Sequence, residues 1–171
     1  MIIIITSCMI CVSSKSNQKY KNMFLIQSDM KQFFQEFCDN VIAVDSSIRF
    51  IGIADGHGRL LATSERKGLK PLLNEEETAQ YAITAATRQY TRISWQPLLG
   101  KIDYTCSHYD KLLRATIPIT DKDNHLCYII IFTFDVETNN FHQIIMEKII
   151  PMIRKNESQF LDKVNNLEFN K

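Results

Sequence analysis

Cys106 and His108 come nearest to a catalytic pair in this sequence. They stand two residues apart in the segment 102–109, where apolar and polar residues alternate weakly as in a β-strand. Both side chains are therefore expected on one face of the strand. A thiol beside an imidazole is the pattern of a nucleophile with its general base. Such pairs are more often ordinary strand residues, so we predict no catalytic site and keep an enzyme only as the third hypothesis.

The cysteines and histidines show no spacing typical of metal ligands. Cys8 and Cys11 form a C-x-x-C, but no second pair or helical His-x-x-x-His accompanies it, as a zinc site requires. The five cysteines are odd in number and irregularly spaced, which gives no disulfide framework and favours a reducing, cytoplasmic location. We therefore predict no metal site and no cofactor. The scattered histidines are His57, His108, His125 and His142.

Basic and aromatic side chains gather in the second half of the chain. If the helix and the strands that carry them pack together, the guanidinium groups converge on an anion in a pocket between helix and sheet. The alternative is a solvated rim, with salt bridges to Glu75, Glu76 or Asp103. The candidate ligand-binding residues are Arg88, Arg92, Tyr104 and Arg114, with Tyr109 and Lys111 nearby.

The glycine-containing stretch Asp55-Gly56-His57-Gly58 is predicted to be a turn. It lacks the Gly-Lys-Ser/Thr of a phosphate-binding loop and does not open a helix. It joins two β-rich runs within residues 48–64, and Asp-Gly and Gly are the residues that tolerate the positive φ of hairpin turns. Asp55, Gly56 and Gly58 are therefore assigned to the structural turn of a β-hairpin.

Two amphipathic helices are predicted around this hairpin. Apolar residues recur three and four positions apart over 29–45, with Ser28 as the N-cap. The second helix is predicted over 75–93, where Asn74 and Glu77 form a variant of the capping box. Its inward face is rich in alanine, which lets a helix lie close to a sheet or to a copy of itself.

The remaining elements are three strands and a last helix. Strands are predicted over 102–109, 111–120 and 126–134; Pro118 stands near the end of the second, as an edge or terminal position allows. The third is almost continuously apolar, as a strand covered on both faces is. A helix begins near Asn140, and Pro151 is expected to kink or interrupt it.

The order α-β-β-α-β-β-β-α predicts an α+β sandwich. Local hairpins on both sides of the central helix favour an antiparallel five-stranded sheet, with the end helices on one face and the helix 75–93 on the other. Residues 28–153 are assigned to this domain. Residues 1–27 are expected to be a leader, either mis-started or poorly ordered, and 154–171 a polar helical or frayed tail.

Charge and hydropathy exclude two classes of function. The chain has 171 residues and a formal net charge of +1, so no broad basic surface for nucleic acid is expected. The apolar run at the start of the chain is shorter than the ~20 residues that span a bilayer. We therefore predict no nucleic-acid binding and no stable membrane insertion.

The hairpin GIADGHGRLLATS, within this order of elements, resembles the roadblock / dynein light chain fold, a relative of the longin and profilin-like sandwiches. The segments GLKPLLNEEE, LLGKIDYTCSHYDKLLRATIPI and NNFHQIIMEKII extend a similarity to a family of small, uncharacterised archaeal proteins over about two thirds of the chain. The resemblance implies dimerisation and a role in regulating small GTPases or in scaffolding. It implies no catalytic motif.

Two hypotheses follow. The first is a non-enzymatic regulatory or scaffold domain, a homodimer built on the sheet and the helix 75–93, whose protein partner resembles a small GTPase. The second is a ligand-sensing module of the PAS or profilin-like type, which binds a small anion between that helix and the sheet.

Overall fold

The computed structural model describes residues 28–168, so the predictions on residues 1–27, Cys8 and Cys11 among them, lie outside the described residues. The chain divides into two units, and the boundary between them falls between Phe33 and Phe34. Residues 28–42 are helical, whereas the sequence predicted a helix to residue 45. The helix ends earlier because the carboxylate of Asp45 accepts hydrogen bonds from the backbone N–H and hydroxyl of Ser47, which fold this segment into a turn.

The second unit is built on a five-stranded sheet in the order β2-β1-β5-β4-β3. All four strand pairings are antiparallel, as the sequence predicted. β5 lies at the centre and is buried along almost its whole length, which explains its continuous apolar sequence. The strands are β1 (Ile48–Asp55), β2 (Leu60–Glu65), β3 (Thr105–Tyr109), β4 (Leu112–Thr120) and β5 (Leu126–Phe134).

Pro118 fits into β4 because this strand extends beyond its pairing with the edge strand β3. It pairs with Ile129 of β5 on one side, while the pairing of β3 with β4 ends at Thr116. No residue of β3 lies opposite Pro118, so the missing N–H of this proline costs no hydrogen bond between β4 and β3.

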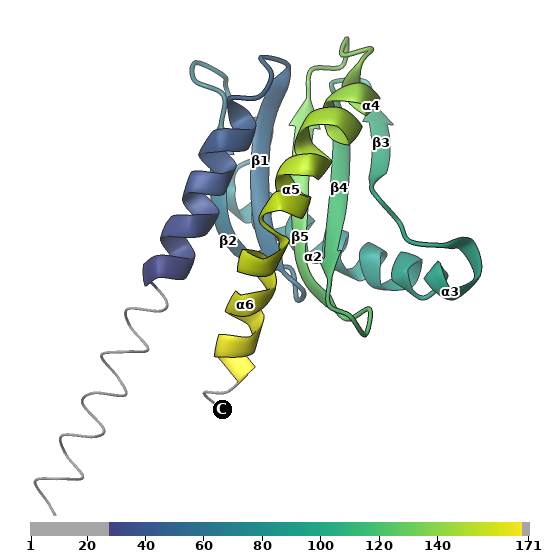
Figure 1. The fold of residues 1–171 in the computed structure, drawn as a ribbon. Helices are drawn as coiled ribbons and strands as arrows, with labels where there is room; N and C mark the ends of the chain where they lie inside the picture. The colour runs from purple at the N-terminus through teal and green to yellow at the C-terminus, as the bar shows by residue number, and fades with distance from the viewer. Residues whose placement is uncertain (1–27, 169–171) are drawn as a thin grey trace, which may run out of the picture. The chain divides into compact units, whose positions relative to one another are not determined.

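Helices cover both faces of this sheet (Figure 1). α2 (Glu75–Ile93) lies on one face, and the helices that follow β5 lie on the other. The short helix α3 (Gln96–Leu99) lies between α2 and β3, where the sequence predicted no helix. The architecture is the predicted α+β sandwich.

α2 is held close to the sheet by small side chains. Ala82, Ala85 and Ala86 are buried in one cluster with Ile129 and Ile131 of β5. At its N-terminus the side chain of Asn74 accepts a hydrogen bond from the backbone N–H of Glu77, and the Glu77 carboxylate accepts one from the backbone of Asn74. This capping box fixes where α2 begins.

The opposite face is closed by an aromatic cluster. The rings of Phe34 and Phe37 lie 5.8 and 5.1 Å from that of Phe160, and Phe34 contacts Tyr128 of β5 edge-on. Phe160 belongs to α6 (Glu157–Glu168) and is fully buried. Residues 157–168 of the polar C-terminal segment are therefore helical and contribute a residue to the core.

The helical region before α6 is interrupted, as Pro151 led us to expect. It comprises α4 (Phe141–Gln143), a π-helical stretch η1 (Ile144–Ile149) and α5 (Ile150–Lys155). The N–H of Ile150 donates to the carbonyl of Ile145, five residues back. Because proline has no N–H, the regular ladder cannot continue through Pro151, and the wider π-helical spacing precedes it.

The turn between β1 and β2 differs from the prediction at one glycine. Only Gly58 has a positive φ, +85°; Gly56 does not. Gly56 is required for another reason, because a Cβ at this position would lie 2.3 Å from the carbonyl oxygen of Leu126. The Asp55 carboxylate accepts hydrogen bonds from the backbone of His57 and Arg59, which closes the turn.

Candidate functional site

α2 lies over β1 and β5 and leaves part of the sheet next to β3 less covered. Its buried face is centred on Ala82, Ala86 and Gln89. At 100° per residue, Tyr81 and Arg88 project to the flank that faces β4 and β3, whereas Ile83 projects to the other flank and contacts the β1–β2 turn. The flank that faces β4 and β3 is the one on which the candidate residues meet.

Arg114 of β4 stacks on this flank. Its guanidinium carbon lies 3.6 Å from the centroid of the Tyr81 ring. The Nε of Arg114 is buried and has no hydrogen-bond partner among the described residues. Desolvation raises the pKa of Tyr81, and the charges of Arg114 and Arg88 oppose this rise. Of the four predicted ligand-binding residues, Arg114 contacts this tyrosine, and Arg88 influences it through its charge alone.

A groove of about 830 Å³ opens beside this stack. It lies between the first turns of α2 and the β3–β4 hairpin, and we call it the α2–hairpin groove. Most of its exposed wall is apolar or aromatic, and charged side chains of both signs border it: Glu76, Glu77, Asp110, Lys111 and Arg114. It is lined by Leu72, Leu73, Tyr81, Tyr109, Leu112 and Arg114, among others. Such a surface suits an apolar segment of a partner or an amphiphilic ligand.

Farther along α2, the side chain of Gln89 connects the helix to β4 and β3. The side chain is fully buried, and its Nε2 donates to the hydroxyl of Thr116 at 2.8 Å. The hydroxyls of Thr116 and Thr105 are 2.6 Å apart. This polar contact spans the space between α2, β4 and β3, and the sequence analysis did not find it because the three residues are far apart in the chain.

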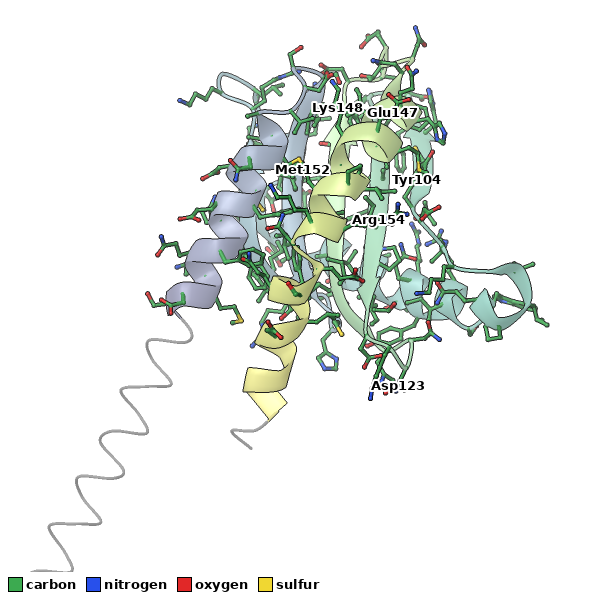
Figure 2. All side chains as sticks on the ribbon, viewed as in Figure 1. Tyr104, Asp123, Glu147, Lys148, Met152 and Arg154 are labelled. Carbon is green, nitrogen blue, oxygen red and sulfur yellow. The ribbon has the colours of Figure 1, made fainter. Side chains whose placement is uncertain are left out.

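Tyr104 does not join the predicted group. Its hydroxyl lies 2.6 Å from Nδ1 of His142 in α4, which places it on the opposite side of the sheet from α2. The neighbouring Asp103 forms an ion pair with Arg154 of α5 and not with an arginine of α2. Figure 2 shows Tyr104 and Arg154 on this side. Tyr104 and Asp103 thus both face the helices that follow β5, and the structure does not bring Tyr104 together with the arginines of α2.

Arg92 also lies apart from the Tyr81–Arg114 stack. It lines a second hollow of about 300 Å³ with Trp95, Leu99, Lys101 and others. This hollow is at the C-terminal end of α2, around α3. The structure therefore does not bring the four candidate residues together: Arg114 stacks on Tyr81, Arg92 lines the hollow around α3, and Tyr104 lies on the opposite face, while Arg88 is exposed on α2.

Cys106 and His108 lie on β3, two residues apart in the strand as the sequence predicted, and pair with Ala115 and Leu113 of β4. Both residues are exposed, yet local desolvation raises the pKa of the Cys106 thiol. A thiol with a raised pKa is mostly protonated at neutral pH and is a weak nucleophile. The surroundings of Cys106 therefore do not activate it.

The turn between β4 and β5 holds a cluster that the sequence analysis missed. Potential ligand atoms of Asp121, Asp123 and His125 lie within 4.8 Å of one another. The carboxylate of Asp121 already accepts hydrogen bonds from the backbone of Asp123 and His125 and contacts the His125 ring at 2.9 Å. These contacts account for the cluster as a capped turn; Asp123 is labelled in Figure 2.

Large apolar side chains are exposed around α2 and α3. Leu98 and Leu99 of α3 are 77% and 81% exposed, and Trp95 before them is 55% exposed. Tyr109, at the end of β3, is 43% exposed. Clustered exposure of this kind marks interaction surfaces more often than isolated apolar residues do.

Within residues 28–168, no helix is both long and apolar enough to cross a membrane.

An antiparallel five-stranded sheet, with α2 on one face and the terminal helices on the other, is the architecture of roadblock/LC7 domains. The chain is similar to MglB of Myxococcus xanthus, with a TM-score of 0.56 and 13% identity over 76% of this chain and 91% of the other. The chain is also similar to the gliding protein MglB of Thermus thermophilus, with a TM-score of 0.55 and 12% identity over 72% of this chain and 87% of the other. For a roadblock/LC7 domain of Streptomyces avermitilis the TM-score is 0.52 and the identity 9%, over 71% of this chain and 94% of the other.

At these identities the similarity establishes the fold. No protein-family model matches the sequence, and no curated protein sequence matches it significantly.

Proposed function

We propose that this chain is a non-enzymatic regulatory or scaffold domain that acts as a homodimer and binds a protein partner. The observation that carries the proposal is the edge strand β3, which follows β4 at the end of the sheet and is bordered by exposed apolar side chains. An unpaired strand edge offers backbone donors and acceptors to a second strand. The same edge of a second copy satisfies them across a two-fold axis.

The similarity of fold to MglB supports self-association, since one MglB structure has a tetrameric arrangement. The roadblock resemblance further favours a partner of the small-GTPase class. In this proposal the chain supplies a preformed platform and no reacting group, which agrees with the unactivated Cys106.

Sedimentation velocity over a range of concentrations tests the homodimer. We expect a dimer that Ser107→Lys in the middle of β3 weakens, because lysine on an edge strand disfavours strand pairing. Thr63→Lys is the matched control, since it places the same charge on β2, the other edge strand. A wild-type chain that is monomeric at all concentrations refutes the homodimer.

The protein partner is tested separately. A small GTPase encoded in the same genome, loaded with GDP or with a non-hydrolysable GTP analogue, is titrated into the purified domain by calorimetry. We expect binding that depends on the nucleotide. If none of the GTPases of that genome binds, the partner belongs to another class.

The second candidate function is the sensing of a small anion, which the buried and unpartnered Nε of Arg114 favours. Inorganic phosphate and acetate are suitable probes. An increase of the melting temperature with either anion, lost in Arg114→Gln, supports sensing. The absence of any increase excludes binding of these two anions.

A further inference from the structure

α3 presents two leucines that nothing in the described part of the chain covers. Leu98 and Leu99 are the most exposed of the large apolar side chains described. They stand on a four-residue helix that Gly100, with φ +89°, terminates. In Figure 1, α3 lies at the lower right, beyond the β3 edge of the sheet. Two leucines in this position are costly in water and gain free energy when a partner buries them.

The α2–hairpin groove has the complementary shape and character. Leu72, Leu73, Tyr81 and Tyr109 give it apolar walls, and its volume is large enough for two leucine side chains. It lies at the end of β3 that holds Tyr109, whereas α3 precedes the start of β3 at Thr105. Within one chain, the leucines of α3 and the groove are therefore at opposite ends of the same strand.

Antiparallel pairing of β3 with a second copy removes this separation. In such a pair the start of one strand lies beside the end of the other. The α3 of each protomer, which already extends beyond the sheet edge, then lies against the α2–hairpin groove of its partner. The two-fold axis makes the contact twice.

The charges of the two surfaces are also complementary. Arg92 and Lys101 flank the hollow around α3, and neither has an ion pair among the described salt bridges. The α2–hairpin groove is lined by three carboxylates, those of Glu76, Glu77 and Asp110, and by two basic groups, those of Lys111 and Arg114, so its lining has a net charge of −1. Opposite charges at the two surfaces favour this orientation and disfavour contact between two α3 segments.

We propose that α3 of one protomer inserts Leu98 and Leu99 into the α2–hairpin groove of a second copy, reciprocally, in a two-fold dimer. The proposal rests on the homodimer proposed above and names the contact that stabilises it. The occupant of the groove is thus a second copy of this chain and not a small molecule.

The first test truncates the leucines. Leu98→Ser with Leu99→Ser leaves the fold intact, because both side chains are exposed, and circular dichroism checks this. We expect the dimer dissociation constant, from sedimentation equilibrium, to rise at least about 100-fold. Ile83→Ser is the control: this half-exposed residue lies on the other flank of α2, and the dissociation constant should stay within about threefold.

The second test exchanges the charges. One variant carries Glu76→Arg and Asp110→Arg in the groove, and the other carries Arg92→Glu and Lys101→Glu around α3. Each alone places like charges at both contacts, whereas a heterodimer of the two restores opposite charges at both. We expect each variant alone to dimerise at least tenfold more weakly than their mixture, measured with one variant fluorescently labelled.

The outcomes separate the two proposals. A monomeric wild-type chain overturns both. A dimer that Ser107→Lys weakens, but that neither the leucine variant nor the charge exchange affects, overturns this inference and leaves the homodimer standing. Binding of phosphate or acetate in the groove of the intact dimer also overturns it, because the leucines would then not fill the groove.

Discussion

The guanidinium carbon of Arg114 lies 3.6 Å from the centroid of the Tyr81 ring and so connects β4 to the flank of α2. Both residues line the α2–hairpin groove. Because Tyr81 is partly buried and Arg114 has a buried Nε, the stack is shielded from water on one side. It therefore sets the shape of the groove whether the occupant is a second copy or an anion.

Replacement of Tyr81 tests the energy of this stack. Tyr81→Leu keeps an apolar side chain but removes the ring, and we expect the free energy of unfolding to fall by about 0.5–1 kcal/mol. Tyr81→Phe retains a ring and should lose less. Urea denaturation at one fixed protein concentration measures both. Equal losses in the two variants would show that the ring face contributes nothing.

The dependence of stability on pH should reflect Asp135. Its carboxylate accepts hydrogen bonds from Arg66 and Arg49, at 2.6 and 2.7 Å, and these two arginines hold its pKa below the usual value. A lowered folded-state pKa stabilises the protein above the unfolded value of about 3.9, and this contribution is lost as the pH falls through the folded pKa.

Asp135→Asn removes that contribution. We expect the variant to be about 1–2 kcal/mol less stable than the wild type at pH 7, with the difference shrinking below about pH 4 as the wild-type carboxylate is protonated. Urea denaturation between pH 7 and pH 3 measures the difference. Asp162→Asn, on an exposed residue, is the control. A difference that stays constant with pH would contradict the role assigned to the two arginines.

Glycines 58 and 68 give a matched pair for backbone strain. Both have a positive φ, +85° and +79°, but a Cβ on Gly58 would lie 2.4 Å from the Cα of Ile83, while nothing lies within 4 Å of one on Gly68. We expect Gly68→Ala to cost about 1 kcal/mol, from the conformation alone, and Gly58→Ala to cost at least about twice as much. Thermal denaturation ranks the two, and a reversed order would be incompatible with close packing of α2 on the hairpin turn.

The sequence predicted the elements of this fold well because their signals are local. The β-rich runs of β1 and β2, the capping box at Asn74 and the change of helix type just before Pro151 each depend on residues a few positions apart. The layers followed from the order of the elements, since hairpins on both sides of a single helix leave few ways to cover a sheet.

The candidate site was predicted less well because it depends on which face of the sheet each segment lies on. Arg114 of β4 stacks on Tyr81 of α2, whereas Arg88 is exposed and acts on this tyrosine only through its charge. Tyr104 does not lie with them but on the other face, where His142 is its partner. Nor does alternation along a strand reveal that Gly56 is needed for its contact with Leu126, which is 70 residues away in the chain.

Phe160 tests whether α6 belongs to the folded core. Its ring is fully buried against Phe34, Phe37 and Tyr128, although the four residues before it in the sequence are polar. Phe160→Ala leaves a cavity among these rings, and we expect a loss of about 3–5 kcal/mol in the free energy of unfolding. Asp162→Ala, on the exposed side of the same helix, should change it by less than about 0.5 kcal/mol. Chemical denaturation compares the two, and equal stabilities would mean that α6 folds independently of the sheet.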